Sequence, residues 1–341
     1  MFIMIEKIRI GILGCAAIAE KYSINAFKSI SNVELVCIAS RDHNKAKEWA
    51  AKHNIQAEKS YDAVLQRDDI DAVYIPLPVG LHEEWTVKTA KAGKNVLCEK
   101  SLTDNLKSAK NMIETCKSQG VVLYENFMCG YHPQHAKVIE LIHKRTLGEP
   151  FVFQGYFGFP PIDKNNFRYN KDLGGGSLND AGTYTVFMAR KMLESEPIAV
   201  TSKLLVDSET NVDIQGSAYL EFPNERAAFS AFGFNQVYQN NYIIWGTKGL
   251  VRVLRAYGIP PNAEPIVEVL QNDGTKDFIS QLKIEPADHF ALIFQDFCDI
   301  LLNKDKEKIA RTYDSILAQA KVMEALRVSA RENRKVEIKE V

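Results

Sequence analysis

The sequence of 341 residues has no pair of cysteines spaced as C-x-x-C and no dense cysteine framework. Its six cysteines are scattered, which is typical of reduced thiols in a cytosolic protein: Cys15, Cys37, Cys98, Cys116, Cys129 and Cys298. Charge of one sign is not in excess either, because 42 Lys and Arg stand against 43 Asp and Glu without a basic block. We therefore expect neither nucleic acid nor an anionic membrane surface as a partner.

Long apolar runs are also missing, and none approaches the ~18 residues of a membrane span. The N-terminal run MFIMIEKIRIGILG is interrupted by Glu6, Lys7 and Arg9 well before it reaches signal-peptide length. We expect this run to form the first strand rather than a targeting segment. The protein is accordingly expected to be cytoplasmic.

Motifs of two common catalytic classes are absent as well. The sequence has no G-x-S-x-G elbow and no Cys/His pair that would indicate a hydrolase. His132 and His135 can share a helix face, but no third ligand follows nearby, so we expect no metal site.

From residue 7 to about residue 124, short β-rich runs alternate with helical segments. The runs cover residues 7–14, 33–40, 71–78, 94–100 and 121–126. Continuous apolar strands with helical crossovers predict a parallel sheet covered on both faces, and hence an open α/β fold. A helix is expected from Ala16 to Ser29, and Asp42 is expected to cap the helix after the second strand.

Beyond residue 124 the pattern changes to strands joined by short turns. Pro133 is expected in the first turn of a helix that follows His132. Several of the later runs alternate apolar and polar residues, which predicts a mostly antiparallel open sheet with one buried face. These runs cover residues 151–159, 198–206, 216–222, 226–234, 241–246, 250–258 and 265–271, and helical patterns follow at 287–303 and 310–331. A prior of roughly 150 residues per domain agrees with two domains, residues 1–124 and 125–341.

The segment GCAAIA, residues 14–19, follows the first strand and opens a helix, as a dinucleotide-binding fingerprint does. Its spacing is that of G-x-G-x-x-G/A, with Ala16 and Ala19 in place of the second and third glycines. Gly14 allows the tight turn, and the small Ala16 lets a pyrophosphate approach the backbone N–H groups at the helix N-terminus. A glycine in a strand-to-helix turn is common, so the prediction depends on the order strand, turn, helix.

The end of the second strand indicates which dinucleotide is bound. An NAD enzyme usually has an acidic residue there for the ribose 2′-hydroxyl, whereas this sequence has Ser40 and Arg41. A hydroxyl and a guanidinium suit a 2′-phosphate, which favours NADP(H) over NAD(H). The structural alternative is a solvated arginine in a turn.

Two residues are candidates for acid–base chemistry. Lys100 ends the predicted strand over residues 94–100, at the edge where open α/β sheets bind ligands, although a lysine there is most often a solvated charge. Tyr184 opens the pattern TYTVFMARKML, where it can also be the first core residue of an amphipathic helix. Glycines 174–176 would let the backbone pass close to a ligand, and Asp180 is expected to cap the helix that carries Tyr184.

Together, Lys100 and Tyr184 predict a mechanism. A ketone that receives a hydride develops an alkoxide, which needs a proton and a nearby positive charge. Lowering the pKa of a tyrosine from about 10 to about 7 requires roughly 4 kcal/mol. An ammonium group about 4 Å away supplies a similar amount at an effective dielectric constant near 20. One lysine is therefore enough to make a tyrosine a proton donor.

The sequence resembles the glucose-fructose oxidoreductase / inositol dehydrogenase family over essentially its whole length. The motifs that carry the resemblance are GILGCAAIA, SRD, IPLPVGLHEEW, AGKNVLCEK and GGGSLNDAGTYTV, in the order of the family. The resemblance implies a Rossmann domain followed by an α/β domain whose large open sheet commonly forms the subunit interface. It places the lysine of the family's E-K-P motif on Lys100, with Ser101 in place of the proline. Many members carry histidine at the position of Tyr184. The glucose-fructose oxidoreductase and dihydrodiol dehydrogenase branches carry tyrosine there, as this sequence does.

Two longer segments, LYENFMCGYHPQH and GFPPIDKNNFRYNKDLGGGSLNDAGTY, resemble the NADPH-dependent 3-ketoreductases of nucleotide-linked deoxysugars. That resemblance implies cofactor contacts from Gly14, Cys15, Ala16, Ala17, Ile18, Ser40, Arg41, Pro76, Leu77, His82, Glu99 and Lys100. It implies substrate contacts from Asn126, Tyr131, His132, Arg168, Tyr169, Asp180 and Tyr184. Structural alternatives stay open, with Asn126 and His132 as turn or cap residues and Tyr131 as a packing residue.

The leading hypothesis is a cytoplasmic NADPH-dependent oxidoreductase that reduces a keto group, at C-3, of a nucleotide-linked deoxysugar. Its partners would be a small-molecule substrate and further copies of itself, in a homodimer or homotetramer formed through the C-terminal sheet. A second hypothesis is an NADP-dependent aldose or trans-dihydrodiol dehydrogenase. A third is a non-catalytic NADP(H)-binding redox sensor, against which Lys100 and Tyr184 argue. The nucleotide, the sugar carbon, the hydride face and the size of the oligomer are left open by the sequence.

Overall fold

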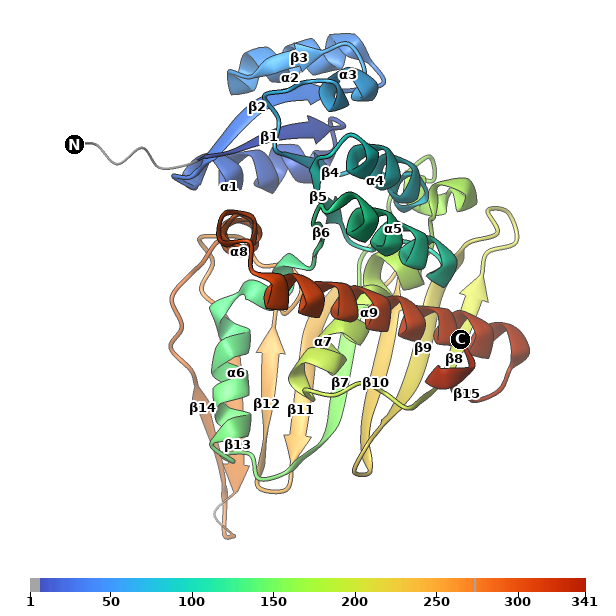
Figure 1. The fold of residues 1–341 in the computed structure, drawn as a ribbon. Coiled ribbons are helices and arrows are strands. Elements are labelled where there is room, and N and C mark those ends of the chain that lie inside the picture. Colours follow the sequence, from blue (N-terminus) through green and yellow to red (C-terminus); the bar gives the residue numbers. More distant parts are fainter. Residues whose placement is uncertain (1–6, 273) are drawn as a thin grey trace, which may run out of the picture. The chain divides into compact units, whose positions relative to one another are not determined.

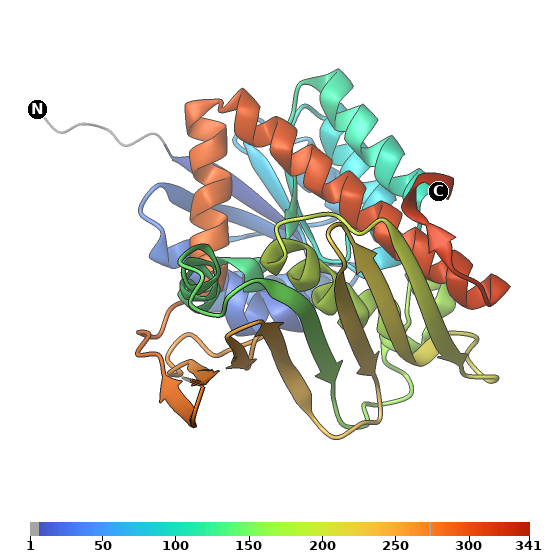
Figure 2. The same ribbon diagram turned by 90° about the horizontal axis from the view of Figure 1, so that it is seen from below.

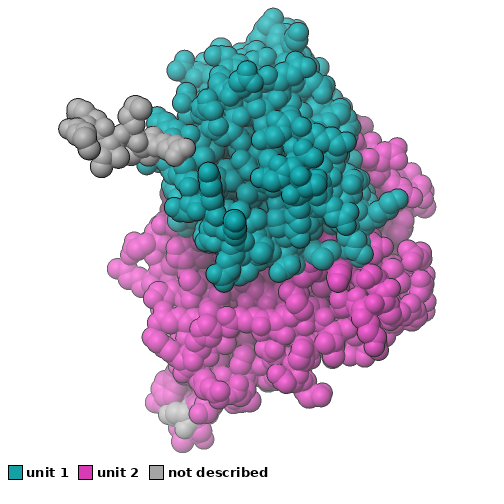
Figure 3. All heavy atoms as spheres, viewed as in Figure 1, with its two compact units in different colours: residues 1–127, 290–317 teal, residues 128–289, 318–341 magenta. Residues whose placement is uncertain are grey.

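The computed structural model describes residues 7–272 and 274–341, and the chain forms two compact units (Figure 3). Unit 1 comprises residues 1–127 and 290–317, and unit 2 comprises residues 128–289 and 318–341. The chain thus returns to unit 1 after the second sheet, which the expected division at residues 124 and 125 did not include. That division into domains stays a prediction, and residues 1–6 of the expected first strand lie outside the described part.

Unit 1 is built on a six-stranded sheet whose neighbouring strands are all parallel. The strands are β1 (Ile8–Leu13), β2 (Val33–Ala39), β3 (Gln56–Glu58), β4 (Ala72–Ile75), β5 (Asn95–Glu99) and β6 (Leu123–Asn126). Their order, β3-β2-β1-β4-β5-β6, is that of a doubly wound Rossmann fold, so the predicted open parallel sheet is confirmed. The short edge strand β3 was not predicted, because it has no apolar run.

Five α-helices of the described part of unit 1 lie between these strands in the chain, and two more come from the end of the chain (Figure 1). They are α1 (Ile24–Ser29), α2 (His43–His53), α3 (Tyr61–Leu65), α4 (His82–Lys91), α5 (Leu106–Gln119), α8 (His289–Asn303) and the first part of α9 (Lys306–Glu332). Asp42 caps α2 as predicted, since its carboxylate accepts from two backbone N–H groups of the first turn. The helix expected over residues 16–29 is present from residue 17 to residue 29, with one irregular turn. A π-helical turn, η1 (Ala19–Ser23), precedes α1.

Both faces of this sheet are covered. On one face Phe27 of α1 and Phe294 of α8 stack with their ring centroids 4.0 Å apart, and Tyr74 of β4 meets both rings at steep angles. On the other face the core formed with α4 and α5 includes Tyr313 and Ile316 of α9. The Tyr313 hydroxyl also donates to the backbone oxygen of Val121, 2.8 Å away. Two helices from the end of the chain therefore complete the core of unit 1.

Unit 2 contains a nine-stranded sheet with the order β14-β13-β12-β11-β7-β10-β9-β8-β15 (Figure 2). Only β7 and β10 pair in parallel, so the predicted mostly antiparallel sheet is confirmed. The strands are β7 (Pro150–Gly158), β8 (Ala199–Val206), β9 (Asp213–Phe222), β10 (Arg226–Gly233), β11 (Gln239–Gly246), β12 (Gly249–Leu254), β13 (Ile266–Asn272), β14 (Asp277–Gln281) and β15 (Val336–Glu337). The edge strands β14 and β15 were not predicted, because one is exposed throughout and the other has two residues.

Helices of unit 2 lie against one face of the nine-stranded sheet (Figure 2). They are α6 (Pro133–His143), which has the proline in its first turn as predicted, α7 (Thr183–Met192) and the last part of α9. On the covered face Phe153, Leu220 and Tyr242 are fully buried, whereas Phe229 and Trp245 are exposed on the other face. The predicted buried and open faces are thus present. Within the described residues, every helix is too short or too polar to cross a bilayer.

Candidate functional site

The predicted site residues fall into two groups, one in each unit. In unit 1 the backbone turns sharply at Gly14, which has a φ of +116°. Its N–H donates to the backbone oxygen of Ala39 at 2.9 Å, which ties the loop to the end of β2. A Cβ at this position would lie 2.9 Å from a methyl carbon of Leu77. Gly14 is therefore required by both φ and space, and Cys15 and Ala16 follow it before the helix that begins at Ala17 and continues through Ile18.

A group of polar side chains surrounds this loop at the end of β2. The Ser40 hydroxyl accepts from the N–H of Asp42 at 3.2 Å and is also hydrogen-bonded to the Cys15 thiol. The next residue, Arg41, is exposed. The ammonium of Lys45, in the first turn of α2, donates to the backbone oxygen of Cys15 at 3.1 Å. Lys45 was missed from the sequence. The sequence signal for Lys45 is its position five residues after Ser40, in the first turn of the next helix.

The loops after β4 and β5 are joined by His82. This histidine is fully buried, and burial lowers its pKa. Its Nε2 lies 2.7 Å from the backbone oxygen of Leu77, the residue after Pro76, and its Nδ1 lies 3.0 Å from that of Ser101. Both ring nitrogens of His82, one of the predicted cofactor residues, thus lie within hydrogen-bond distance of backbone oxygens. It holds the two loops together beside the glycine loop.

A buried polar network lies at the carboxyl ends of β4, β5 and β6. The Tyr74 hydroxyl and the Asn126 side-chain amide both donate to Oε1 of Glu99, each at 2.6 Å. The Ser23 hydroxyl, on η1, lies 2.8 Å from the Tyr74 hydroxyl. Burial raises the pKa of Glu99 above its usual range in spite of these hydrogen bonds. Lys100 follows directly, and the peptide bond between Lys100 and Ser101 is cis.

In unit 2 the candidate Tyr184 is the second residue of α7 and is largely buried. Its ring meets Phe157 at a steep angle with 5.2 Å between centroids, and its hydroxyl lies 3.9 Å from the sulfur of Met128. A π-helical turn, η6 (Leu178–Gly182), precedes α7 directly. Such turns are rare and concentrate at functional sites. In the described chain they occur twice, here and after the glycine loop.

The segment before α7 corrects one expectation and adds a packing reason for its glycines. Asp180 does not cap the helix, because it lies inside η6 and its carboxylate accepts from Nε of Arg168 at 2.7 Å. The glycines are required by the protein itself rather than by a ligand alone. A Cβ at Gly175 would lie 2.4 Å from the Arg168 backbone oxygen, and one at Gly176, with φ of +119°, would lie 2.3 Å from Asp213.

Asp213 and the end of α9 hold this segment in place. The Asp213 carboxylate accepts from the Ser177 hydroxyl at 2.7 Å and from the Leu178 N–H at 2.6 Å, at the start of η6. The buried Gln319 of α9 donates to the backbone oxygen of Thr183 at 3.1 Å and accepts from Arg190 at 2.7 Å. The residue before Tyr184 is therefore fixed by a side chain from the far end of the sequence.

Other predicted substrate residues of unit 2 lie near this helix or before α6. Tyr169 packs edge-on against Phe234, with 5.6 Å between ring centroids, and Tyr131 ends a short 3₁₀ turn. His132 is buried and caps α6, because its Nδ1 accepts from the Gln134 N–H at 3.2 Å. Burial lowers the pKa of His132 to about 4. In the described part of the chain, no group of three or more His, Cys, Asp or Glu side chains has the arrangement of a metal site.

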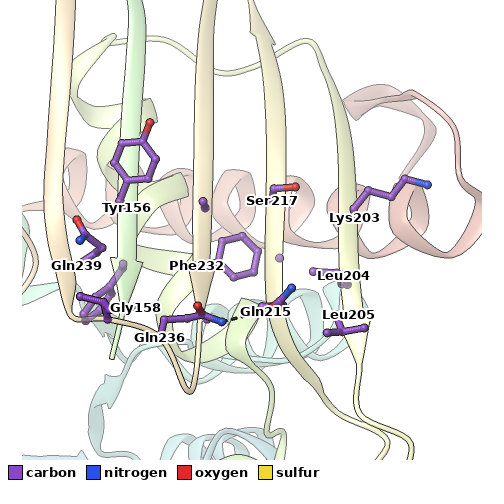
Figure 4. Close-up of a pocket in the computed structure, with 15 residues that line it drawn as sticks. Tyr156, Gly158, Lys203, Leu204, Leu205, Gln215, Ser217, Phe232, Gln236 and Gln239 are labelled. Atoms are coloured by element: carbon purple, nitrogen blue, oxygen red, sulfur yellow. Dashed lines mark hydrogen bonds between the residues drawn. The ribbon is translucent and has the colours of Figure 1, made fainter. Parts of the chain in front are cut away.

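The uncovered face of the unit 2 sheet carries a pocket of about 620 Å³ (Figure 4). It lies over β7, β8, β9 and β10, and its polar lining includes Tyr156, Lys203, Gln215, Ser217 and Gln239. None of the predicted site residues lines it.

Fold and loop geometry define a protein of the Rossmann class whose glycine loop suits a dinucleotide, with an added α/β unit. The sequence profile of the GFO_IDH_MocA oxidoreductase family, with a NAD-binding Rossmann fold, matches residues 8–127. The profile of the GFO/IDH/MocA C-terminal domain matches residues 135–252. The chain belongs to this family, and the resemblance seen in its motifs is confirmed.

Relatives with named activities match between 74% and 96% of the chain. The chain is 32% identical over 327 residues to dTDP-3,4-didehydro-2,6-dideoxy-alpha-D-glucose 3-reductase of Actinomadura kijaniata, covering 96% of this chain and 97% of the relative. It is 35% identical over 255 residues to D-xylose 1-dehydrogenase (NADP(+)) 2 of Haloferax volcanii, covering 74% and 78% of the two chains. The crystal structure of a 3-ketoreductase from Actinomadura kijaniata with NADP and TDP-benzene superposes with a TM-score of 0.90 at 32% identity, covering 95% and 98%.

The buried His132 predicts a pH dependence of stability. Its pKa of about 4 lies below the value of about 6.5 in an unfolded chain, so the unfolded state binds the proton first. The free energy of unfolding should therefore fall as pH drops from about 6.5 to about 4, by about 1.4 kcal/mol per pH unit for this residue. His132→Asn keeps a capping acceptor and should remove the part of the pH dependence of the unfolding free energy that His132 contributes.

Urea unfolding at pH 7.5 and pH 5.0, followed by tryptophan fluorescence, measures the difference between wild type and variant. Comparing the two proteins cancels the contributions of titrating groups that do not interact with His132. An equal loss of stability in both proteins between these pH values would show that His132 is not held in the neutral state.

Proposed function

We propose that this protein is an NADPH-dependent reductase of the keto group, at C-3, of a dTDP-linked deoxysugar. The observation that carries the proposal is the match over 96% of the chain to a dTDP-3,4-didehydro-2,6-dideoxy-alpha-D-glucose 3-reductase. Proteins of that name from three other bacteria match at 32–34% identity. The substrate class and the reduced carbon come from these relatives.

The loop residues of unit 1 fit NADP(H). The turn at Gly14 and the small Ala16 leave room for a pyrophosphate at a helix N-terminus. Ser40, Arg41 and Lys45 gather a hydroxyl and two cations at the end of β2, where a 2′-phosphate would lie. Neighbouring solved structures of the 3-ketoreductase contain NADP. We propose Pro76, Leu77 and His82 as the further wall of this site.

Lys100 and Tyr184 are proposed as the catalytic residues. Bound NADPH supplies a hydride to the carbonyl carbon of the substrate. The Tyr184 hydroxyl then gives its proton to the carbonyl oxygen, and the Lys100 ammonium stabilises the negative charge that develops there. The hydride and the proton together convert the ketone to a secondary alcohol. Arg168, whose guanidinium is paired with the Asp180 carboxylate at 2.7 Å, is a proposed substrate contact.

Solved variants of the related 3-ketoreductase support this pair. The substituted residues named for that enzyme are a lysine, changed to alanine or glutamate, and a tyrosine, changed to phenylalanine. In its numbering the two are 84 residues apart, as Lys100 and Tyr184 are in this chain. Tyr131, His132, Tyr169 and Asp180 remain proposed substrate contacts.

A second candidate function is oxidation of a free aldose with NADP+. It is favoured by the 35% identity to D-xylose 1-dehydrogenase (NADP(+)) 2 over 74% of the chain. A trans-1,2-dihydrobenzene-1,2-diol dehydrogenase of Xenopus tropicalis matches at 32% identity over 64% of the chain. The two functions differ in whether a nucleotide handle on the sugar increases turnover.

Substitution of the proposed catalytic residues should abolish reduction. Tyr184→Phe removes the proton donor and Lys100→Met removes the charge, so each should lower kcat by about 10²–10⁴ while NADPH still binds. The assay follows NADPH oxidation at 340 nm with a dTDP-linked 3-keto deoxysugar. Lys110→Met, at an exposed residue of α5, is the control. Near-wild-type turnover in both variants would contradict the mechanism, and NADPH production from D-xylose without a nucleotide would favour the second candidate.

The cations at the end of β2 should select NADPH. A charge-assisted hydrogen bond contributes about 1.5–3 kcal/mol, so Arg41→Ala and Lys45→Ala should each weaken NADPH binding by about tenfold or more. NADH, which lacks the 2′-phosphate, should bind wild type and both variants alike. Fluorescence titration of the reduced cofactors measures this, with the exposed Lys47→Ala on the same helix as control. Parallel losses for NADH and NADPH would contradict the assignment.

The uncovered sheet face is proposed to join copies of this chain. Tyr219 and Phe229 lie opposite each other there, with rings 5.1 Å apart, and Trp245 is half exposed on the same face. Several exposed aromatic residues on one sheet face favour a protein interface. On the same face Arg252 and Glu268 form an ion pair at 3.2 Å and so offset each other's charge.

A charge in that face should separate the copies. Trp245→Glu would bury a carboxylate in the interface, which shifts the protein toward the monomer. Sedimentation velocity measures the mass, with Leu292→Glu, an equally drastic change at an exposed residue of α8, as control. A monomeric wild type, or a Trp245→Glu protein that sediments as the wild type does, would overturn this part of the proposal.

A further inference from the structure

The side-chain amide of Asn126 has a fixed orientation. Asn126 ends β6 and is the cross-strand partner of Glu99, which ends β5. Its Nδ2 donates to Oε1 of Glu99 at 2.6 Å, and the Tyr74 hydroxyl donates to the same oxygen at 2.6 Å. Because Oε1 already accepts from Tyr74, a proton on Glu99 would reside on the other carboxyl oxygen. Oε1 is an acceptor in either state, so it always faces Nδ2 of Asn126.

The opposite end of this amide is an orphaned acceptor. Asn126 is completely buried, and its Oδ1 has no hydrogen-bond partner among the described residues. Buried polar atoms almost always have a partner, because leaving one without a partner costs free energy. The Glu99 contact prevents a flip of the amide that would hide this oxygen. The fold therefore keeps a buried acceptor without a partner among the described residues at this position, at a cost in free energy.

The position of Asn126 indicates which ligand group it meets. Open α/β sheets bind ligands at the carboxyl ends of their strands, on both sides of the strand where the order reverses. In the order β3-β2-β1-β4-β5-β6 the glycine loop follows β1 and the 2′-phosphate residues follow β2. The other half of a bound dinucleotide therefore extends toward β4, β5 and β6. The group there that carries two N–H donors on a planar ring substituent is the nicotinamide carboxamide.

We propose that Oδ1 of Asn126 accepts a hydrogen bond from the carboxamide N–H of the nicotinamide, and that Glu99 is the positioning residue that orients the amide for it. The inference rests on the proposed function, because it requires NADP(H) as the cofactor. It assigns Asn126 to the cofactor, whereas the family resemblance placed this residue in the substrate cleft. One hydrogen bond of this kind fixes the rotation of the nicotinamide ring and so decides which of its faces meets the substrate.

The test compares two oxidised cofactors that differ in one group. 3-Acetylpyridine adenine dinucleotide phosphate replaces the carboxamide NH2 of NADP+ by a methyl group and keeps the rest of the molecule. Isothermal titration calorimetry gives the Kd of each for wild type and for Asn126→Leu. Wild type should bind NADP+ about tenfold more tightly than the analogue. In Asn126→Leu the two dissociation constants should agree within about twofold.

Glu99→Gln serves as a second variant in case Asn126→Leu does not fold. An amide at position 99 can donate to Oδ1 of Asn126 and so turn its acceptor away, which should also reduce the discrimination between the two cofactors. Discrimination that is unchanged in the folded variants would overturn the inference, since the partner of Asn126 would then be a ribose hydroxyl or the substrate. Wild type that binds neither cofactor would instead overturn the proposed function itself.

Discussion

The parallel pairing of the strands in unit 1 is the constraint on which its candidate site depends. Parallel strands place all their carboxyl ends at one edge, so residues far apart in the sequence are gathered there. Gly14, Ser40, Leu77, Lys100 and Asn126 each end or follow a strand of this sheet. Their order along the edge follows from the strand order alone.

Buried polar contacts then make this edge a fixed frame. The glycine loop is tied to β2 through the Ala39 backbone oxygen, and His82 joins the loops after β4 and β5. Glu99 collects hydrogen bonds from two neighbouring strands. A buried carboxyl group with raised pKa is costly, and its partners make it a rigid centre rather than a titrating surface group. Cofactor loops that are held in this way need little reorganisation on binding.

Unit 2 differs from unit 1 in two ways. It holds the start of the helix that carries Tyr184 in place, and it leaves one face of its sheet uncovered. The start of η6 is anchored by Asp213, and the first turn of α7 is anchored by Gln319. The glycines before Tyr184 are therefore constrained by Arg168 and Asp213, in addition to any ligand that lies there. The uncovered face has the opposite character, since exposed aromatic residues lie on it without a covering helix in the described chain.

Much of the fold could be predicted, because apolar periodicity and turn residues are local signals. The parallel and antiparallel sheets, the cap at Asp42 and the proline at the start of α6 were all predicted correctly. The expected cap at Asp180 was wrong, because Asp180 lies inside a π-helical turn and its carboxylate accepts from Arg168, twelve residues earlier. The short strands β3, β14 and β15 were missed, because neighbouring strands rather than their own residues create them.

The sequence by itself determined the family and the two sheets, and it indicated Lys100 and Tyr184 as the residues now proposed to be catalytic. These follow from periodicity and from motifs whose residues are adjacent in the chain. Only the tertiary structure decided that Lys45 lies at the glycine loop, that Gln319 holds the residue before Tyr184, and that Asn126 presents an acceptor without a partner in the described chain. Each of these depends on contacts between side chains that the fold brings together, and such contacts leave no periodic signal in the sequence.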